Sequence, residues 1–255
     1  MALADGKNRN FQTGEQSLMT GLLASVNSLI EAKIALTNQV DIIDLKQPEK
    51  GALGALDTQT ITEVVTYIDG ECLVSATIGD LPMQPETILQ AVKTTAQTGV
   101  DFIKIGFFPG GKWHESIDAL ANLSKNDLKL IAVFFADQHL DNSFIPILKK
   151  AGFDGVMLDT MKKQHGSLTQ VLPLEKIAEF VNITKNQKLL CGLAGSLQLF
   201  DIPSLLDLQP DYLGFRGAIC LQKNRIESID ESALQKIYSS IMEYQSDVKS
   251  FLNSV

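Results

Sequence analysis

The chain has 255 residues, of which 45% are hydrophobic, and it carries a formal net charge of −8. This length is ordinary for one α/β barrel, and the apolar content is sufficient for a large buried core. Nucleic acid is excluded as a partner because no basic stripe is present, and displacing its counterions requires clustered lysine and arginine. No apolar run reaches the roughly 18 residues of a membrane span, so we expect no membrane partner.

The three cysteines, Cys72, Cys191 and Cys220, lie far apart in apolar runs and form no CxxC pair. Such cysteines are typical of reduced, buried thiols in a cytoplasmic protein. Residues 1–17 are polar and contain no apolar signal core, so we expect a disordered lead there and one domain over residues 18–255. The sequence is compatible with a homo-oligomer.

Eight short apolar runs alternate with segments of helical periodicity. The predicted strands are residues 21–26, 40–46, 72–79, 102–107, 128–136, 155–160, 188–195 and 212–217. The predicted helices include residues 28–38, 58–68, 85–99 and 174–186, and residues 231–255 close the fold as the eighth helix. This alternation predicts right-handed crossovers and a parallel sheet. Because no GxGxxG or GxxxxGK[ST] motif follows the first strand and no linker divides the chain, we predict a single (β/α)8 TIM barrel.

Charged residues recur at the carboxyl ends of the predicted strands, where buried charge is costly unless it is paired or functional. In chain order they are Asp44, Lys46, Asp80, Lys104, Asp159, Lys162, Lys163 and Arg216. Active sites of α/β barrels lie at this end of the strands. The sequence therefore predicts an active site that is built from these charged side chains.

The lysines indicate covalent catalysis. A partly desolvated lysine near another cation has a lowered pKa, becomes a nucleophile and can form a Schiff base with a carbonyl group. Lys46 is the predicted nucleophile, Lys104 can approach it across the barrel mouth, and Asp44 and Asp159 can transfer protons. The alternative is that Lys46 binds phosphate or forms a salt bridge with Asp44.

Neither a metal nor an organic cofactor is expected. The three histidines, His114, His139 and His165, are isolated and lack the spacing of metal ligands. The alternative is a Mg²⁺ site formed by carboxylates alone, those of Asp44, Asp80 and Asp159.

A phosphorylated small molecule is the predicted substrate. Small residues at 192–196 (GLAGS) follow the seventh strand, and Arg216 and Gly217 follow the eighth. In this fold these two loops commonly hold phosphate through backbone N–H groups, and a guanidinium adds charge. The predicted substrate- or phosphate-binding residues are Asp80, Gly195, Ser196, Arg216, Gly217 and Arg225. For Arg225, exposure to solvent is an equally good interpretation.

Six segments together resemble the (5-formylfuran-3-yl)methyl phosphate synthase family. They are DIIDLKQPEKGALGA (41–55), LVSATIGDLP (73–82), DFIKIGF (101–107), GVMLDTMKK (155–163), CGLAGS (191–196) and LGFRGAIC (213–220). The resemblance runs over nearly the whole chain from about Gly21. It implies a TIM barrel without metal or organic cofactor, which joins two molecules of glyceraldehyde 3-phosphate, cyclises them and removes phosphate and water. The product is a furan aldehyde phosphate for methanofuran biosynthesis.

The resemblance also implies roles for individual residues. Lys46 is the Schiff-base lysine, Asp44 is its neighbouring acid/base, and Lys104, Asp159 and Lys163 match further catalytic positions. The adjacent Lys162 departs from the family pattern and leaves two candidates for the last role. A second departure is that the stretch 222–225, which includes Arg225, is shorter than in the family.

Two other functions fit the same residues. One is a class I aldolase or an isomerase of another small sugar phosphate, which would release neither inorganic phosphate nor a furan. The other is a non-catalytic barrel that binds a sugar phosphate. Such a barrel would need GLAGS and Arg216, but it would have no use for Lys46, Lys104 and Asp159 together.

Overall fold

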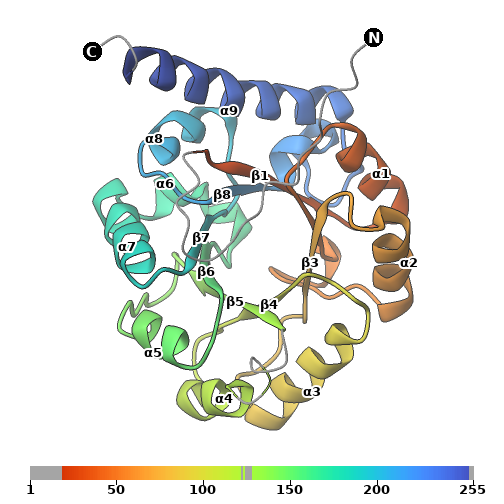
Figure 1. Cartoon of the computed structure of the whole chain (residues 1–255), viewed down its shortest axis with the longest axis vertical. Coiled ribbons are helices and arrows are strands. Elements are labelled where there is room, and N and C mark those ends of the chain that lie inside the picture. The colour runs from red at the N-terminus through yellow and green to blue at the C-terminus, as the bar shows by residue number, and fades with distance from the viewer. Residues whose placement is uncertain (1–18, 122, 124–127, 253–255) are drawn as a thin grey trace.

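The computed structural model describes residues 19–121, 123 and 128–252. Its eight strands are all parallel and close into a barrel in chain order, with β8 paired back to β1 (Figure 1). The strands are β1 Gly21–Val26, β2 Ile42–Leu45, β3 Leu73–Thr77, β4 Phe102–Gly106, β5 Lys129–Phe135, β6 Gly155–Asp159, β7 Leu190–Leu193 and β8 Tyr212–Phe215. The predicted single TIM barrel is confirmed. The lead predicted for residues 1–17 lies outside the described residues.

Helices surround the barrel as an outer layer (Figure 1). They are α1 Leu29–Thr37, α2 Thr58–Ile68, α3 Pro85–Ala96, α4 Trp113–Leu120, α5 Phe144–Lys150, α6 Leu168–Val171, α7 Leu174–Asn186, α8 Ile202–Leu206 and α9 Glu231–Leu252. Short 3-10 turns occur at Pro48–Lys50, Lys163–His165, Leu199–Asp201, Gly217–Ile219 and Leu221–Lys223. The long helix α9 lies across the outside of the barrel, beside α8 and close to α1 (Figure 1).

Apolar packing holds the barrel on both faces of its sheet. Outward-facing strand residues pack against the helices in one large cluster, which includes Ile43, Ile103, Phe134 and Leu158. Inward-facing residues fill the lower part of the barrel and include Leu23, Phe102, Ile131, Met157 and Tyr212. This two-sided burial explains why the strands are nearly uniform apolar runs in the sequence.

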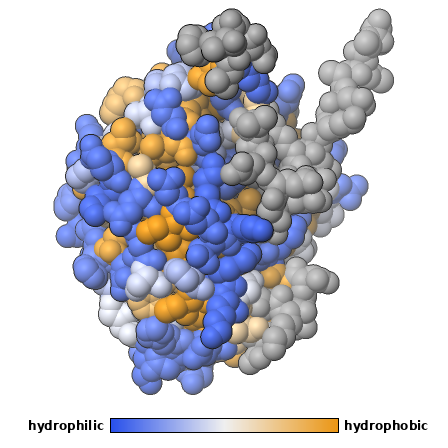
Figure 2. Space-filling view, turned by 60° about the vertical axis from the view of Figure 1, so that its left-hand side comes forward, coloured by the Kyte–Doolittle hydropathy of each residue, from blue (hydrophilic) through white to orange (hydrophobic). Residues whose placement is uncertain are grey.

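The side of the barrel that bears α5, α7 and α8 shows small groups of apolar residues between hydrophilic ones (Figure 2). Among the described residues, Leu199 and Phe200 are the large exposed apolar side chains that precede α8. Within that part of the chain, no helix combines the length and the hydropathy needed to cross a membrane.

Candidate active site

A carboxylate lies deep in the barrel, on strand β2. The register places Asp44 between Ser25 of β1 and Ser75 of β3. Its carboxylate accepts hydrogen bonds from Ser25 Oγ (2.9 Å) and Ser75 Oγ (2.7 Å), and it pairs with Lys104 Nζ of β4 at 2.8 Å. Burial by itself would raise the pKa of Asp44, but the charges of Lys104 and Lys46 outweigh it and hold the pKa below its usual value. Asp44 is therefore a fixed anion.

A second carboxylate lies at the end of β6. Asp159 accepts a hydrogen bond from its neighbour Thr160 N–H at 2.7 Å and pairs with Lys163 Nζ at 2.6 Å. Burial opposes ionisation, but the positive charges of Lys163 and Lys46 and these hydrogen bonds lower the pKa of Asp159 to about 2. The side chain of Lys162 is exposed, so the geometry assigns the ion pair with Asp159 to Lys163.

Lys46 follows β2 directly and lies between these two pairs. It shares a face with Asp44 because the two residues are two positions apart on an extended chain. Only 7% of the Lys46 surface is exposed. Unlike Lys104 and Lys163, it has no ion pair within 4.0 Å among the described residues. Burial lowers its pKa to about 7, because the attraction of Asp159 and Asp44 only partly offsets desolvation and repulsion by Lys163 and Lys104.

A cavity of about 350 Å³ opens above these charges. Its lining residues include Lys46, Asp159, Lys163, Gly195, Ser196, Gly217, Lys223, Asn224 and Arg225. This volume is in the range of small-ligand pockets. Asp44 and Lys104 do not line the cavity, since they lie below it in the barrel. Lys46, Lys163 and Asp159 are therefore the charged catalytic candidates that can contact a ligand there.

A second part of the cavity wall, the phosphate end predicted from the sequence, includes Gly195, Ser196 and Gly217. Gly195 and Ser196 both have positive φ values, +107° and +49°. A Cβ atom on Gly195 would lie 2.8 Å from Thr160 Cγ2, so the loop after β7 can pass close to β6 only with glycine there. Among the described residues, no protein acceptor is recorded for the N–H groups of Gly195, Ser196 and Gly217. These groups are suited to an anionic oxygen.

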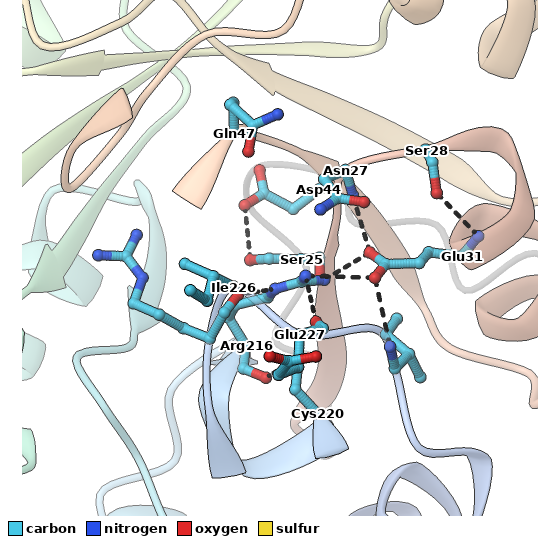
Figure 3. A network of polar contacts seen from close by, with 12 residues as sticks. Ser25, Asn27, Ser28, Glu31, Asp44, Gln47, Arg216, Cys220, Ile226 and Glu227 are labelled. Carbon is cyan, nitrogen blue, oxygen red and sulfur yellow. Dashed lines mark hydrogen bonds and ion pairs between the residues drawn. The ribbon is translucent and has the colours of Figure 1, made fainter. Parts of the chain in front are cut away.

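The structure gives two of the predicted phosphate-binding residues other partners within the protein. Arg216 lines the cavity but is only 7% exposed, and its guanidinium is paired with Glu31 of α1 (Figure 3). Its five N–H donors are used in five hydrogen bonds, so none remains for phosphate. Asp80 accepts hydrogen bonds from the N–H groups of Ala52 (2.8 Å) and Leu53 (2.7 Å) and thereby holds the loop after β2.

Four residues of this region were not predicted from the sequence as part of the site. Ser25 and Ser75 are polar residues within apolar strands, at the register of Asp44, and this pairing was the available signal. Glu31 is a buried acid in the first turn of α1. Tyr212 lies inside the barrel against Gly192, where a Cβ atom would lie 2.3 Å from its ring. Nothing in the local sequence distinguishes Glu31 or Tyr212 from ordinary residues.

Among the described residues, no group of three or more His, Cys, Asp or Glu side chains is arranged to hold a metal ion. The three cysteines are buried and unpaired by disulfides. Burial raises the pKa of Cys72 to about 12 and that of Cys220 to about 11, so neither thiol is a ready nucleophile.

Solved structures resemble the chain in fold. The 3-hexulose-6-phosphate synthase of Salmonella typhimurium has a TM-score of 0.65 at 15% sequence identity, covering 88% of this chain and 100% of that one. Phosphoribosyl anthranilate isomerase of Thermus thermophilus has a TM-score of 0.61 at 11% identity, covering 87% of this chain and 98% of that one. At these identities the likeness supports the barrel alone.

Sequence relatives are more informative. A (5-formylfuran-3-yl)methyl phosphate synthase of Methanococcus maripaludis is 34% identical over 226 residues, which cover 84% of this chain and 96% of that protein. The synthase of the same name from Methanopyrus kandleri is 35% identical over 215 residues, covering 80% and 91%. A protein of Methylorubrum extorquens, to which this activity is ascribed provisionally, is 40% identical over 209 residues, covering 82% and 86%. The family model for 4-HFC-P synthase matches residues 22–238, and the chain therefore belongs to this synthase family.

Proposed function

We propose that this chain condenses two molecules of glyceraldehyde 3-phosphate through a Schiff base on Lys46. The product would be (5-formylfuran-3-yl)methyl phosphate, the compound named for its relatives, and it would serve methanofuran biosynthesis. The observation that carries this proposal is the state of Lys46. It is the buried lysine of the cavity and has no ion pair among the described residues, and burial lowers its pKa to about 7. A free amine is therefore accessible at this lysine at neutral pH, in contrast to a lysine of ordinary pKa.

The first step is attack on an aldehyde. Lys46 Nζ adds to the carbonyl carbon of one triose phosphate, and loss of water from this adduct gives a protonated imine. The imine withdraws electrons, so the C–H bond on the neighbouring carbon becomes acidic. Removal of that proton gives an enamine, whose carbon forms a new C–C bond with the aldehyde of the second triose phosphate. A hydroxyl of the second triose then adds to the imine carbon and closes the ring, and Lys46 leaves as the free amine. Net loss of inorganic phosphate and a second water completes the furan.

The Asp159–Lys163 pair is suited to proton transfer in these steps. Lys163 is half-buried, lines the cavity and can donate a proton to the hydroxyl that leaves as water. Asp159 is a weak base while Lys163 is charged, since this charge contributes to its pKa of about 2. Once Lys163 has given up its proton, Asp159 becomes more basic, because that positive charge no longer lowers its pKa.

The Asp44–Lys104 pair has a different role in this proposal. Asp44 is fully buried, does not line the cavity and accepts three hydrogen bonds from Ser25, Ser75 and Lys104. We therefore assign it no proton transfer with substrate, in contrast to the prediction from the sequence. The negative charge of Asp44 raises the pKa of Lys46, and the positive charge of Lys104 lowers it. The two charges of the pair therefore help to set the pKa of Lys46.

The phosphate group of the substrate would bind at the other end of the cavity. The N–H groups of Gly195, Ser196 and Gly217 can donate to its oxygens, and Arg225 supplies positive charge. Arg225 donates one hydrogen bond to the carbonyl of Gly51, at 2.8 Å, which leaves other guanidinium donors for a ligand.

The test is product analysis with purified protein and glyceraldehyde 3-phosphate. We expect an ultraviolet absorbance from the furan aldehyde that grows in step with the release of inorganic phosphate. A sugar phosphate formed without phosphate release would instead identify a class I aldolase or an isomerase. Binding without any turnover would identify a non-catalytic barrel. The Lys46→Arg variant is the matched control, because it keeps a positive charge and cannot form an imine.

A further inference from the structure

A buried ion pair lies beside the phosphate end of the cavity. Arg216 follows β8, and Glu31 lies in the first turn of α1. Two hydrogen bonds join the guanidinium to the carboxylate, at 2.5 Å and 3.2 Å, and the side chains are each 5% exposed (Figure 3). Removing two charges from water is costly, so such a pair is weak evidence for added stability. Its remaining contacts indicate what else it does.

The guanidinium is bound to the loop that follows β8. Arg216 Nε donates to the carbonyl of Arg225 at 2.7 Å, and one terminal nitrogen donates to the carbonyl of Glu227 at 2.9 Å. The other terminal nitrogen donates to the carbonyl of Ser25 on β1, at 3.1 Å. Arg216 therefore fixes two carbonyls of this loop to the rigid end of β1.

The carboxylate of Glu31 holds the far side of the same loop. It accepts hydrogen bonds from the N–H groups of Ile229 (3.2 Å) and Asn27 (2.9 Å). The base of the loop is closed by an antiparallel bridge between Cys220 and Ile229 and by a hydrogen bond from Leu221 N–H to the carbonyl of Ser228. The ion pair thus anchors the interior of a closed loop, residues 220–229.

This loop carries one wall of the cavity. Lys223, Asn224 and Arg225 line it, and only Arg225 among them is half-buried. The carbonyl of Arg225 is held by Arg216, and its guanidinium reaches the carbonyl of Gly51 in the loop after β2. Gly51 has φ +121°, and a Cβ atom there would lie 2.0 Å from Asp80 Oδ2. The position of Arg225 is therefore defined at both ends.

We propose that Arg216 and Glu31 are positioning residues that hold loop 220–229, and with it Arg225, at the phosphate end of the cavity. This inference rests on the proposed function in one respect, the assignment of that end to a phosphate group. It differs from the role predicted for Arg216 from the sequence, because Arg216 acts through the loop and makes no contact with the anion.

Glu31→Gln distinguishes the two roles. If Arg216 bound the anion directly, removing the negative charge of Glu31 would leave phosphate binding unchanged or strengthen it. If the pair positions the loop, Glu31→Gln weakens binding of inorganic phosphate and raises KM for glyceraldehyde 3-phosphate by about tenfold to a hundredfold. Arg216→Lys, which keeps the charge but not the planar fork of donors, has the same effect. The acid limb of the kcat profile, which reports Lys46, stays at the wild-type pH in both variants.

Hydrogen exchange gives a readout that does not depend on the substrate. Amides 221–229 are expected to exchange at least about tenfold faster in Glu31→Gln and Arg216→Lys, while amides of β3 to β6 are unchanged. Glu31→Asp keeps the charge with a shorter reach and serves if Glu31→Gln does not fold. Glu179→Gln is the matched control, because it removes an acid from an exposed ion pair with Lys176.

The outcomes separate cleanly. Unchanged phosphate affinity in Glu31→Gln, with loss only in Arg216→Lys, would show direct anion binding by Arg216 and overturn the proposal. A lowered Tm with unchanged KM and unchanged loop exchange would also overturn it, since the pair would then serve stability alone. A wild-type protein that binds phosphate but does not convert glyceraldehyde 3-phosphate would refute the proposed function. The exchange and phosphate measurements would still decide the positioning role.

Discussion

The two ends of the cavity differ in the groups that they offer a substrate. The lysine end offers buried charged side chains, whereas the phosphate end offers backbone N–H groups and the loop that carries Arg225. Asp44–Lys104 and Asp159–Lys163 are neutralised pairs, and Lys46 lies between them without one among the described residues. At the other end, Gly195, Ser196 and Gly217 line the cavity, and the buried pair Arg216–Glu31 is hydrogen-bonded to the loop after β8.

The two ends are therefore expected to respond differently to substitution. Side-chain charge is lost when one residue changes, and the buried partner that remains is left unpaired. Backbone donors persist through most substitutions, because they depend on the path of the chain and not on its side chains. Single changes at the lysine end should abolish activity or destabilise the fold, and most of those at the phosphate end should alter KM alone.

The largest expected effect is that of Lys46→Arg. Activity should fall by at least about a thousandfold, because arginine keeps the charge but cannot form an imine. Borohydride added during turnover of the wild type should fix a triose adduct on Lys46, which peptide mass mapping would detect. Lys162→Arg is the control, since Lys162 is exposed, and it should retain activity. An adduct on Lys104 or Lys163 would show that the nucleophile has been misassigned.

Asp44→Asn should mainly reduce stability. The substitution leaves the ammonium of Lys104, which is 2% exposed, without its counter-ion. Loss of one partner from a buried pair costs about 3–5 kcal/mol, and urea denaturation would measure it. The acid limb of the rate profile should also move to lower pH, because Asp44 normally raises the pKa of Lys46. Glu179→Gln, in an exposed pair, should leave the Tm unchanged. An equal response of the two variants would contradict the burial argument.

The lowered pKa of Lys46 should appear in the pH dependence of folding. Between pH 7 and 10.5 the unfolded chain holds a proton on Lys46 that the folded protein has released, so stability rises with pH in this window. The rise is at most about 1.4 kcal/mol per pH unit. Lys46→Met should lack this contribution, so the difference in unfolding free energy between variant and wild type should change between pH 7 and 9. Parallel curves would indicate an ordinary lysine pKa.

The sequence predicted the barrel because its signal is periodic and distributed over the whole chain. The short helices α5 and α8 were not predicted, because seven and five residues are too few to show a helical periodicity. The lysine end could be predicted because charge within apolar strands is conspicuous. The ion pair between Lys104 and Asp44 could not be predicted from the sequence, because β3 lies between the strands that carry the two residues.

The phosphate end shows a different limit. Arg216 follows a barrel strand at the usual position for anion binding, and nothing in its neighbourhood indicates that Glu31, 185 residues earlier, occupies it. Residue type and position predicted a positive charge near the site. The partner of the Arg216 guanidinium, however, is supplied by helix α1. The resemblance to a family did not correct this, because a motif identifies a residue and not its hydrogen-bond partners.

The smallest effect is expected for Ser196→Ala. The Ser196 hydroxyl makes a long contact, 3.4 Å, with the carbonyl of Lys163, and the backbone N–H groups remain in the variant. Loss of one hydroxyl hydrogen bond costs about 0.5–1.5 kcal/mol, so KM should rise by about twofold to tenfold while kcat is unchanged. Gly195→Ala is the comparison. Its Cβ would lie 2.8 Å from Thr160 Cγ2 at a φ of +107°, so it must displace the loop and should weaken phosphate binding far more. If Ser196→Ala were the more damaging of the two, the hydroxyl and not the backbone would hold the phosphate, and the contrast between the ends of the cavity would fail.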